Sequence, residues 1–279
     1  QQRGYDRAAT MFSPTGQILQ VEYAEKTVRL GSSSIGMISK EGVVIISHRR
    51  HRDKLMIDAS ANKISEIDEH IICVSAGIMS DARVLVERAR ATSQQHRVNY
   101  DSAPNTESVV RDIADVKQQF TQHGGARPFG VSMMIGGFNG KPVLYTTDIT
   151  GNYFQYKANA IGENDEKLKK FLEQKYKEEM TNKEVLKLGL AIFKEVQGSD
   201  FDIEEAVQNE LGQLGHFNLS EAINEISPID PIVARRHTIE TGSMRYFIPL
   251  FTDLESYKKI SSKTDNPRIV LCLAENQED

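Results

Sequence analysis

The chain has 279 residues, of which 39% are hydrophobic and 26% charged, the composition of an ordinary globular protein. Its formal charge of −5 argues against a general nucleic-acid surface, and no apolar run approaches the roughly 18 residues of a membrane span. The only two cysteines, Cys73 and Cys272, indicate a reducing compartment rather than a disulfide framework.

The first predicted elements are a turn, a helix and a hairpin. Residues 14–16 read Pro-Thr-Gly, which is turn chemistry, and an amphipathic helix is expected over residues 17–30. Gly31 is expected to end this helix in the left-handed conformation. Strands are predicted over residues 33–39 and 43–47, joined by a tight hairpin turn.

A third strand and two long helices follow. The strand is expected over residues 71–75, and the first helix begins near Ser80. Its inward stripe at three-and-four spacing is predicted to be Val84, Leu85, Arg88 and Ala89. The second helix is predicted from a cap at Asn105 to about Gln122. Its inward residues are expected to be Val109, Ile113, Val116 and Phe120.

Strands return over residues 131–137, 143–147 and 153–158, and two helices follow over residues 163–176 and 181–196. Strand pairs on tight turns imply antiparallel sheets, and a helix pair after each strand group implies helices on the outer faces. The pattern predicts an α+β protein, a four-layer αββα sandwich of two antiparallel sheets between helix layers.

The C-terminal part departs from this regular order. Residues 199–231 are expected to form an inserted helical segment, either a tolerated surface decoration or an added contact with a neighbour. A hairpin and a helix over residues 232–262 are expected to complete the core, and residues 263–279 to be a mobile tail. The other divisions are a leading segment over residues 1–31 and a core domain over residues 32–198.

Several separate motifs occur in a fixed order along the chain. They are the run from Tyr5 to Gln17, Val21-Glu22-Tyr23-Ala24, the hairpin around Gly36, Asp81-Ala82-Arg83-Val84-Leu85-Val86, and Gly124-Gly125-Ala126-Arg127-Pro128-Phe129-Gly130-Val131. Together they resemble the α subunits of the proteasome core particle (20S), in particular the archaeal type. The resemblance runs from about residue 5 to residue 196 and implies the fold of N-terminal nucleophile hydrolases.

The resemblance implies a subunit without catalytic residues. An N-terminal nucleophile hydrolase attacks with the side chain of its first residue and uses that residue's α-amine as base. Alignment on Gly36 places Ser32 at the nucleophile's position, but Ser32 has an amide nitrogen because other residues precede it. His48 falls where the catalytic relatives carry an acidic residue, and Lys63 where they carry a lysine. No cofactor and no metal are expected, and the basic run that begins at His48 is interpreted as a solvated loop.

Three groups of functional residues are implied by the resemblance. The gate group is Tyr5, Asp6, Arg7, Pro14 and Tyr23. The group that binds activator C-termini is Lys63, Gly16 and Glu22. The pore constriction is His123, Gly124, Gly125 and Ala126. The chemistry suits these roles, because a phenol and a carboxylate can hydrogen-bond between neighbours, an ammonium can bind a terminal carboxylate, and glycines allow close approach of backbones.

The implied partners are other α subunits in a seven-membered ring, proteasome β subunits, a ring-shaped ATPase or other activator, and unfolded protein substrates in transit. The expected location is the cytoplasm, with no nucleic acid and no membrane as partner. Two alternatives stay open. One is a self-processing N-terminal nucleophile hydrolase with Ser32 as nucleophile. The other is a free-standing scaffold that uses residues 199–231.

Overall fold

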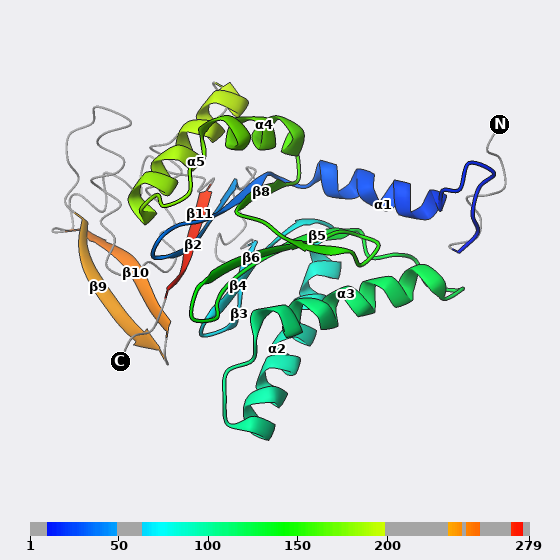
Figure 1. The fold of residues 1–279 in the computed structure, drawn as a ribbon, viewed down its shortest axis with the longest axis horizontal. Coiled ribbons are helices and arrows are strands. Elements are labelled where there is room, and N and C mark those ends of the chain that lie inside the picture. The colour runs from blue at the N-terminus through cyan, green and yellow to red at the C-terminus, as the bar shows by residue number, and fades with distance from the viewer. Residues whose placement is uncertain (1–9, 49–62, 199–233, 242–243, 252–268, 276–279) are drawn as a thin grey trace.

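The computed structural model describes residues 10–48, 63–198, 234–241, 244–251 and 269–275, the last three ranges as backbone. Within these ranges two large antiparallel sheets lie face to face, and helices cover their outer sides (Figure 1). The predicted four-layer αββα sandwich is confirmed.

The larger sheet has five strands. Their order is β3 (Ile64–Asp68), β4 (Ile71–Gly77), β5 (Val131–Phe138), β6 (Pro142–Thr147) and β7 (Tyr153–Gln155). Helices α2 (Met79–Tyr100) and α3 (Thr106–Gln122) cover its outer face, with Leu85, Ile113 and Met133 fully buried between helices and sheet. As predicted, the Asn105 side chain caps α3, accepting a hydrogen bond from the Glu107 backbone nitrogen at 2.8 Å.

The smaller sheet has four strands. Their order is β11 (Ile269–Glu275), β2 (Gly42–His48), β1 (Ser34–Ile38) and β8 (Ala158–Ile161). Helices α4 (Asp165–Lys175) and α5 (Asn182–Gln197) cover its outer face, where Leu168, Leu190 and Phe193 are fully buried. Each sheet therefore buries one face against its own pair of helices and the other against its partner sheet.

Alternation along β1 explains how the two sheets pack so closely. Ile35 and Met37 face the helices of the smaller sheet and are fully buried there. Gly36 faces the other sheet, and a Cβ at this position would overlap the side chains of Met134 and Leu144. A glycine is therefore required here because the opposing sheet occupies the space of a side chain.

Helix α1 (Leu19–Leu30) lies against one end of the sandwich. Leu19, Val21 and Ala24 are its buried residues, and the last two form a small cluster with Ile149. The expected amphipathic helix is thus confirmed, and its first residue lies two positions later than predicted.

The prediction for Gly31 is wrong. Its backbone is extended, with φ −70° and ψ 146°, rather than left-handed. A Cβ at Gly31 would lie 2.5 Å from the Gly77 nitrogen, at the end of β4. The glycine is needed for this close approach between backbones, and not for an unusual dihedral angle.

Three of the predicted inward positions on the long helices are also wrong. Arg88 of α2 is exposed, and its guanidinium pairs with Asp112 of α3 at 2.8 Å. Val84 of α2 is 51% exposed, and the stripe that faces the sheet contains Ala82, Leu85, Val86 and Ala89. Phe120 of α3 is 37% exposed, with its ring centroid 4.7 Å from that of Phe129. Near the end of a helix the sheet no longer covers every apolar side chain.

The strand predicted over residues 153–158 is two strands that belong to different sheets. β7 pairs with β6 in the larger sheet, whereas β8 pairs with β1 in the smaller one. The crossing lies between them: the Tyr156 nitrogen donates to the Leu144 carbonyl at 2.8 Å, and the Lys157 carbonyl accepts from the Ile38 nitrogen at 2.8 Å. These two residues carry the chain from one layer to the next.

The predicted C-terminal hairpin is confirmed in its pairing. β9 (Ala234–Thr241) and β10 (Met244–Phe251) are antiparallel and form a two-stranded sheet of their own. Among the described strands the hairpin pairs with neither large sheet, and β11 lies at the edge of the smaller sheet. That the hairpin and a following helix complete the core stays a prediction. The helix expected after the hairpin and the segment 199–231 lie outside the described residues.

Two further strands were not expected. β3 pairs with β4 at the edge of the larger sheet. β11 lies within residues 263–279, which were expected to be a mobile tail. That expectation is wrong for residues 269–275, because β11 pairs antiparallel with β2 along its whole length.

The start of α5 offers a test of local stability. The Thr181 hydroxyl accepts from the Glu184 nitrogen, and the Glu184 carboxylate accepts from the Thr181 nitrogen, forming a capping box. Thr181→Ala is expected to lower the free energy of unfolding by about 1 kcal/mol, because a backbone N–H at the helix start loses its acceptor. Urea denaturation measures this, and Thr181→Ser should remain close to wild type. An alanine variant as stable as the serine variant would contradict the prediction.

Candidate gate and docking site

The turn before α1 is a compact hairpin loop. The Gly16 nitrogen donates to the Ser13 carbonyl at 2.8 Å, and the Ser13 nitrogen donates to the Gln17 carbonyl at 2.7 Å. A type I turn favours serine at its first position, proline at its second and glycine at its fourth, which matches Ser13, Pro14 and Gly16. Gly16 has a φ of 80°, the left-handed conformation that follows such a turn in a short hairpin loop. The Ser13 hydroxyl also accepts from the Gln17 nitrogen at 3.1 Å. The predicted turn is therefore held by its own hydrogen bonds.

The first turns of α1 present two of the predicted site residues away from the core. Val21 and Ala24 are buried, whereas Glu22 between them is half-buried and Tyr23 is 41% exposed. The Lys26 ammonium lies 5.3 Å from the centre of the Tyr23 ring, within the range of a cation–π contact. Three residues of the predicted gate group (Tyr5, Asp6 and Arg7) lie outside the described residues.

Lys63 is buried at the junction between α1 and β1, and is not a surface lysine. It is 9% exposed. Its ammonium donates to the Ser32 carbonyl at 2.6 Å and to the Ser32 hydroxyl at 2.9 Å, and lies 3.4 Å from the Ser34 hydroxyl. The Ser34 hydroxyl in turn lies 2.8 Å from that of Ser47. A lysine and a serine therefore meet at the position predicted by alignment on Gly36.

The surroundings of Ser32 do not provide the chemistry of a nucleophile. Its nitrogen is a peptide amide, and on the N-terminal side the Gly31 carbonyl accepts from the Glu163 nitrogen at 2.8 Å. A Cβ on Gly162 would lie 2.6 Å from the Ser32 carbonyl oxygen, so this loop closes tightly over the serine. His48 occupies the acidic residue's position, and its Nδ1 lies 3.1 Å from the Gln197 side-chain nitrogen. Ser32 therefore has no free amine, and the loop at Gly162 lies against its carbonyl oxygen.

The predicted constriction residues form the exposed turn that follows α3. His123 ends the helix, and its Nδ1 lies 2.7 Å from the Gln119 carbonyl. Gly125 has a φ of 88°, and a Cβ on either Gly124 or Gly125 would meet nothing within 4 Å. This turn and the turn before α1 lie at the same end of the molecule's long axis (Figure 1).

Comparison with known proteins then decides the family. A family model described as "Proteasome subunit" matches residues 28–207, and a second model, the N-terminal signature of A-type proteasome subunits, matches residues 5–26. The chain belongs to the proteasome subunit family. The proteasome alpha subunit of Archaeoglobus fulgidus is 39% identical over 237 residues, which are 84% of this chain and 94% of that protein. That of Thermococcus sibiricus is 43% identical over 74% of this chain and 80% of its own length.

Within the proteasome family the chain is of the α type and non-catalytic, and hydrolysis is carried by the β subunits. Membership in the family implies assembly into rings with other subunits, the β subunits included. The geometry around Ser32 agrees with this assignment. None of the described helices is long and apolar enough to cross a membrane. The described ranges contain no cluster of three or more His, Cys, Asp or Glu side chains suited to a metal ion.

Two of the proteasome motifs contact each other, which sequence reasoning did not predict. Asp81, in the first turn of α2, accepts from the two terminal nitrogens of Arg127 at 2.6 and 2.7 Å and from the Gly130 nitrogen at 2.9 Å. Burial opposes ionisation of this carboxyl most strongly. The hydrogen bonds from Arg127 and Gly130 outweigh it and hold the pKa of Asp81 below its usual value. The pair joins the start of α2 to the segment that follows the constriction turn.

Lys117 of α3 is a second feature that sequence reasoning missed. It is fully buried, and its ammonium donates to the Val131 carbonyl at 3.0 Å, the Thr147 hydroxyl at 2.7 Å and the Asp148 carbonyl at 3.1 Å. Burial lowers the pKa of Lys117 to about 7, although the nearby Asp148 carboxylate opposes this shift. The sequence does contain a signal for its burial: Lys117 follows the inward-facing Ile113 by four residues, so both lie on the same face of the helix.

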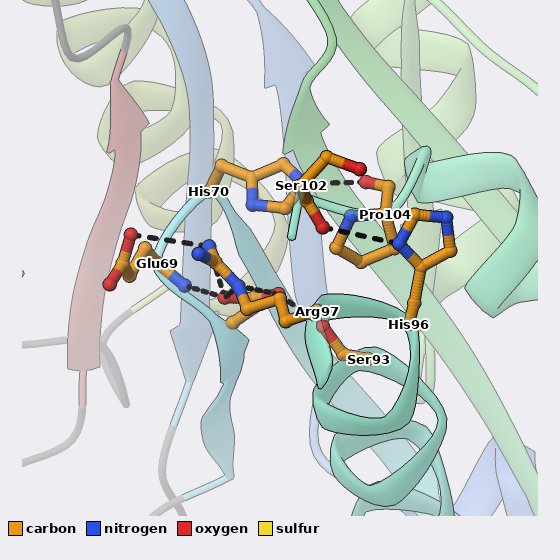
Figure 2. A network of polar contacts seen from close by, with 8 residues as sticks. Glu69, His70, Ser93, His96, Arg97, Ser102 and Pro104 are labelled. Carbon is orange, nitrogen blue, oxygen red and sulfur yellow. Dashed lines mark hydrogen bonds and ion pairs between the residues drawn. The ribbon is translucent and has the colours of Figure 1, made fainter. Parts of the chain in front are cut away.

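An ion pair comparable to that of Asp81 with Arg127 lies near the C-terminal end of α2, between Arg97 and Asp68. Figure 2 shows Arg97 between Ser93 and the turn that joins β3 to β4. Its guanidinium contacts the buried Asp68 at 2.8 Å and Glu69 at 3.2 Å, and Ser93 also donates to Asp68. Burial again opposes ionisation, and the hydrogen bonds from Arg97 and Ser93 lower the pKa of Asp68. His70 in the same turn contacts the Pro104 carbonyl at 2.8 Å through Nε2.

Proposed function

We propose that the leading segment of this α-type proteasome protein gates access to the proteolytic chamber, and that activator C-termini dock beside it. The observation that supports the proposal is the retained segment itself. Residues 10–31 fold into a defined turn and a docked helix directly ahead of Ser32, where a catalytic relative would have its free amine. A segment that blocks catalysis and is itself well packed is available for another task.

The gate would consist of Tyr5, Asp6, Arg7, Pro14 and Tyr23. Tyr23 is exposed on α1, and Pro14 lies in the exposed part of the preceding turn. A carboxylate that accepts from a phenol forms a charge-assisted hydrogen bond, which contributes about 1.5–3 kcal/mol. Repeated around a ring, such bonds would hold the leading segments in one arrangement.

The docking site would consist of Lys63, Gly16 and Glu22. The ammonium of Lys63 rests on a neutral acceptor, the Ser32 carbonyl. The terminal carboxylate of an activator is a stronger acceptor, because its full negative charge strengthens the hydrogen bond. Gly16 and Glu22 lie on the turn and the helix that such binding would shift.

The constriction would consist of His123, Gly124, Gly125 and Ala126, placed below the gate on the path of an unfolded substrate. The turn is exposed, and its two glycines leave space on their outer side. The partners proposed on this basis are a ring-shaped ATPase or other activator and unfolded protein substrates in transit, in the cytoplasm.

The gate is tested by a variant that starts at Thr10, assembled with its β subunits. Degradation of an unfolded protein without activator is expected to rise to the level that wild-type particles reach with activator, because three of the proposed gate residues, Tyr5, Asp6 and Arg7, are missing. Hydrolysis rates of an unfolded protein and of a short fluorogenic peptide measure this, and the short peptide serves as the control for intact β sites. Equal degradation by truncated and full-length particles, at equal peptide hydrolysis, would refute the gate.

A further inference from the structure

The turn at residues 123–126 is held from both sides, although little holds the turn itself. We infer that Lys117 and Arg127 are positioning residues that fix this turn, so that the constriction is a rigid collar and not a flexible flap. The inference rests on the proposed function for the collar itself, but the anchoring can be measured independently of it.

On the α3 side the anchor is Lys117. When protonated, its ammonium has three hydrogens, and three oxygens accept them: those of Val131, Thr147 and Asp148. These acceptors lie at the start of β5 and the end of β6, so one side chain ties the last turns of α3 to two adjacent strands. The Asp148 carboxylate is itself held by Thr150 and Asn152 at 2.7–2.9 Å, which keeps the acceptor loop in place.

On the β5 side the anchor is Arg127, the residue directly after the turn. Its guanidinium binds Asp81 through two parallel hydrogen bonds and also contacts the Pro128 carbonyl at 3.0 Å. Asp81 is 7% exposed and also holds the Gly130 nitrogen. A planar, bidentate pair on a buried carboxylate fixes direction as well as distance.

The turn between these anchors depends on them. A Cβ at Gly124 or Gly125 would meet nothing within 4 Å, so neighbouring side chains do not support these two residues. Glycine also has the widest backbone freedom, which the fold must restrict for the turn to keep one position. The position of the turn is therefore set by the residues that flank it.

The decisive variant is Arg127→Met, studied in particles assembled with β subunits. Amide hydrogen exchange of residues 122–127 is expected to become about tenfold faster or more, because losing the charge-assisted pair makes local opening easier. Arg127→Lys should fall between wild type and the methionine variant, since it keeps the charge but loses the fork. Arg97→Met is the matched control: it breaks an ion pair to a similarly buried aspartate at the far end of α2 and should leave this exchange unchanged.

The same particles test the role of the collar in substrate passage. Hydrolysis of a disulfide-looped polypeptide is measured relative to that of a short peptide, and this ratio is expected to rise in Arg127→Met. Faster exchange with an unchanged ratio would support the anchoring and refute the collar's role in the proposed function. Exchange that is unchanged in Arg127→Met, or equally faster in Arg97→Met, would overturn the inference.

Discussion

Replacing Lys63 by alanine is expected to abolish activator-stimulated peptide hydrolysis while rings still assemble. The Lys63 ammonium is the one cation among the three residues of the proposed docking site, and a terminal carboxylate needs a cation as its partner. Losing a charge-assisted hydrogen bond of about 1.5–3 kcal/mol would weaken the binding of each tail about tenfold to a hundredfold. Stimulation measured against activator concentration, with ring assembly followed by electron microscopy, gives the result.

The control for this experiment is Ser32→Ala. Lys63 loses one hydroxyl acceptor in this variant but keeps the Ser32 carbonyl at 2.6 Å, so stimulation is expected to persist. The same variant tests Ser32 as a nucleophile, because a self-processing hydrolase would lose both its cleavage and its activity. Full stimulation of Lys63→Ala would refute the docking role, and a loss of activity in Ser32→Ala would revive the hydrolase alternative.

Stability should depend on pH through Lys117, and Lys117→Met should remove that dependence. The pKa of this lysine is about 7 in the folded chain and 10.5 when unperturbed. Below pH 7 both states are protonated, so the cost of burying the charge is fully present. Between pH 7 and 10.5 the unfolded state binds more protons, and folding stability rises with pH by up to about 1.4 kcal/mol per unit.

The measured quantity is the difference in free energy of unfolding between wild type and Lys117→Met. From pH 6 to pH 9 this difference is expected to shift in favour of the wild type by about 3 kcal/mol. Urea denaturation at fixed chain concentration and in the same oligomeric state provides it. Lys26→Met, at an exposed position on α1, is the matched control and should show a constant difference. A pH-independent difference for Lys117→Met would show that the buried ammonium keeps its proton throughout.

Local signals in the sequence were sufficient for most of the sandwich. The strand expected over residues 33–39, the cap at Asn105 and the helix expected over residues 181–196 each depend on neighbours within a few positions, and each appears in the structure. The crossing at Tyr156 and Lys157 was not predictable in this way. No glycine or proline interrupts residues 153–158, and only pairing with distant strands shows that the chain changes sheets.

The functional site likewise contains one contact that the sequence predicted and others that depend on residues far apart in the chain. The meeting of Lys63 with Ser32 was predicted, because both positions follow from alignment on the hairpin at Gly36. The pairing of Asp81 with Arg127 was not predicted, although both residues lie in the family's motifs, because a contact across 46 positions leaves no periodic trace. Gly31 was misread for a similar reason: what requires a glycine there is the distant backbone of Gly77.

Helix α1 and the residue that follows it lie very close to the larger sheet. Besides the contact of Gly31 with Gly77, a Cβ on Gly130 would lie 2.7 Å from the Thr27 hydroxyl, which itself donates to the Gly130 carbonyl at 2.9 Å. Main chain therefore lies directly against main chain at Gly31, and only the short Thr27 side chain intervenes at Gly130, so these two contacts leave little room for the helix to slide. We therefore expect a force applied at the outer end of α1 to move the helix and the sandwich together as one rigid body. In a closed ring, the neighbouring protomers would have to move with it.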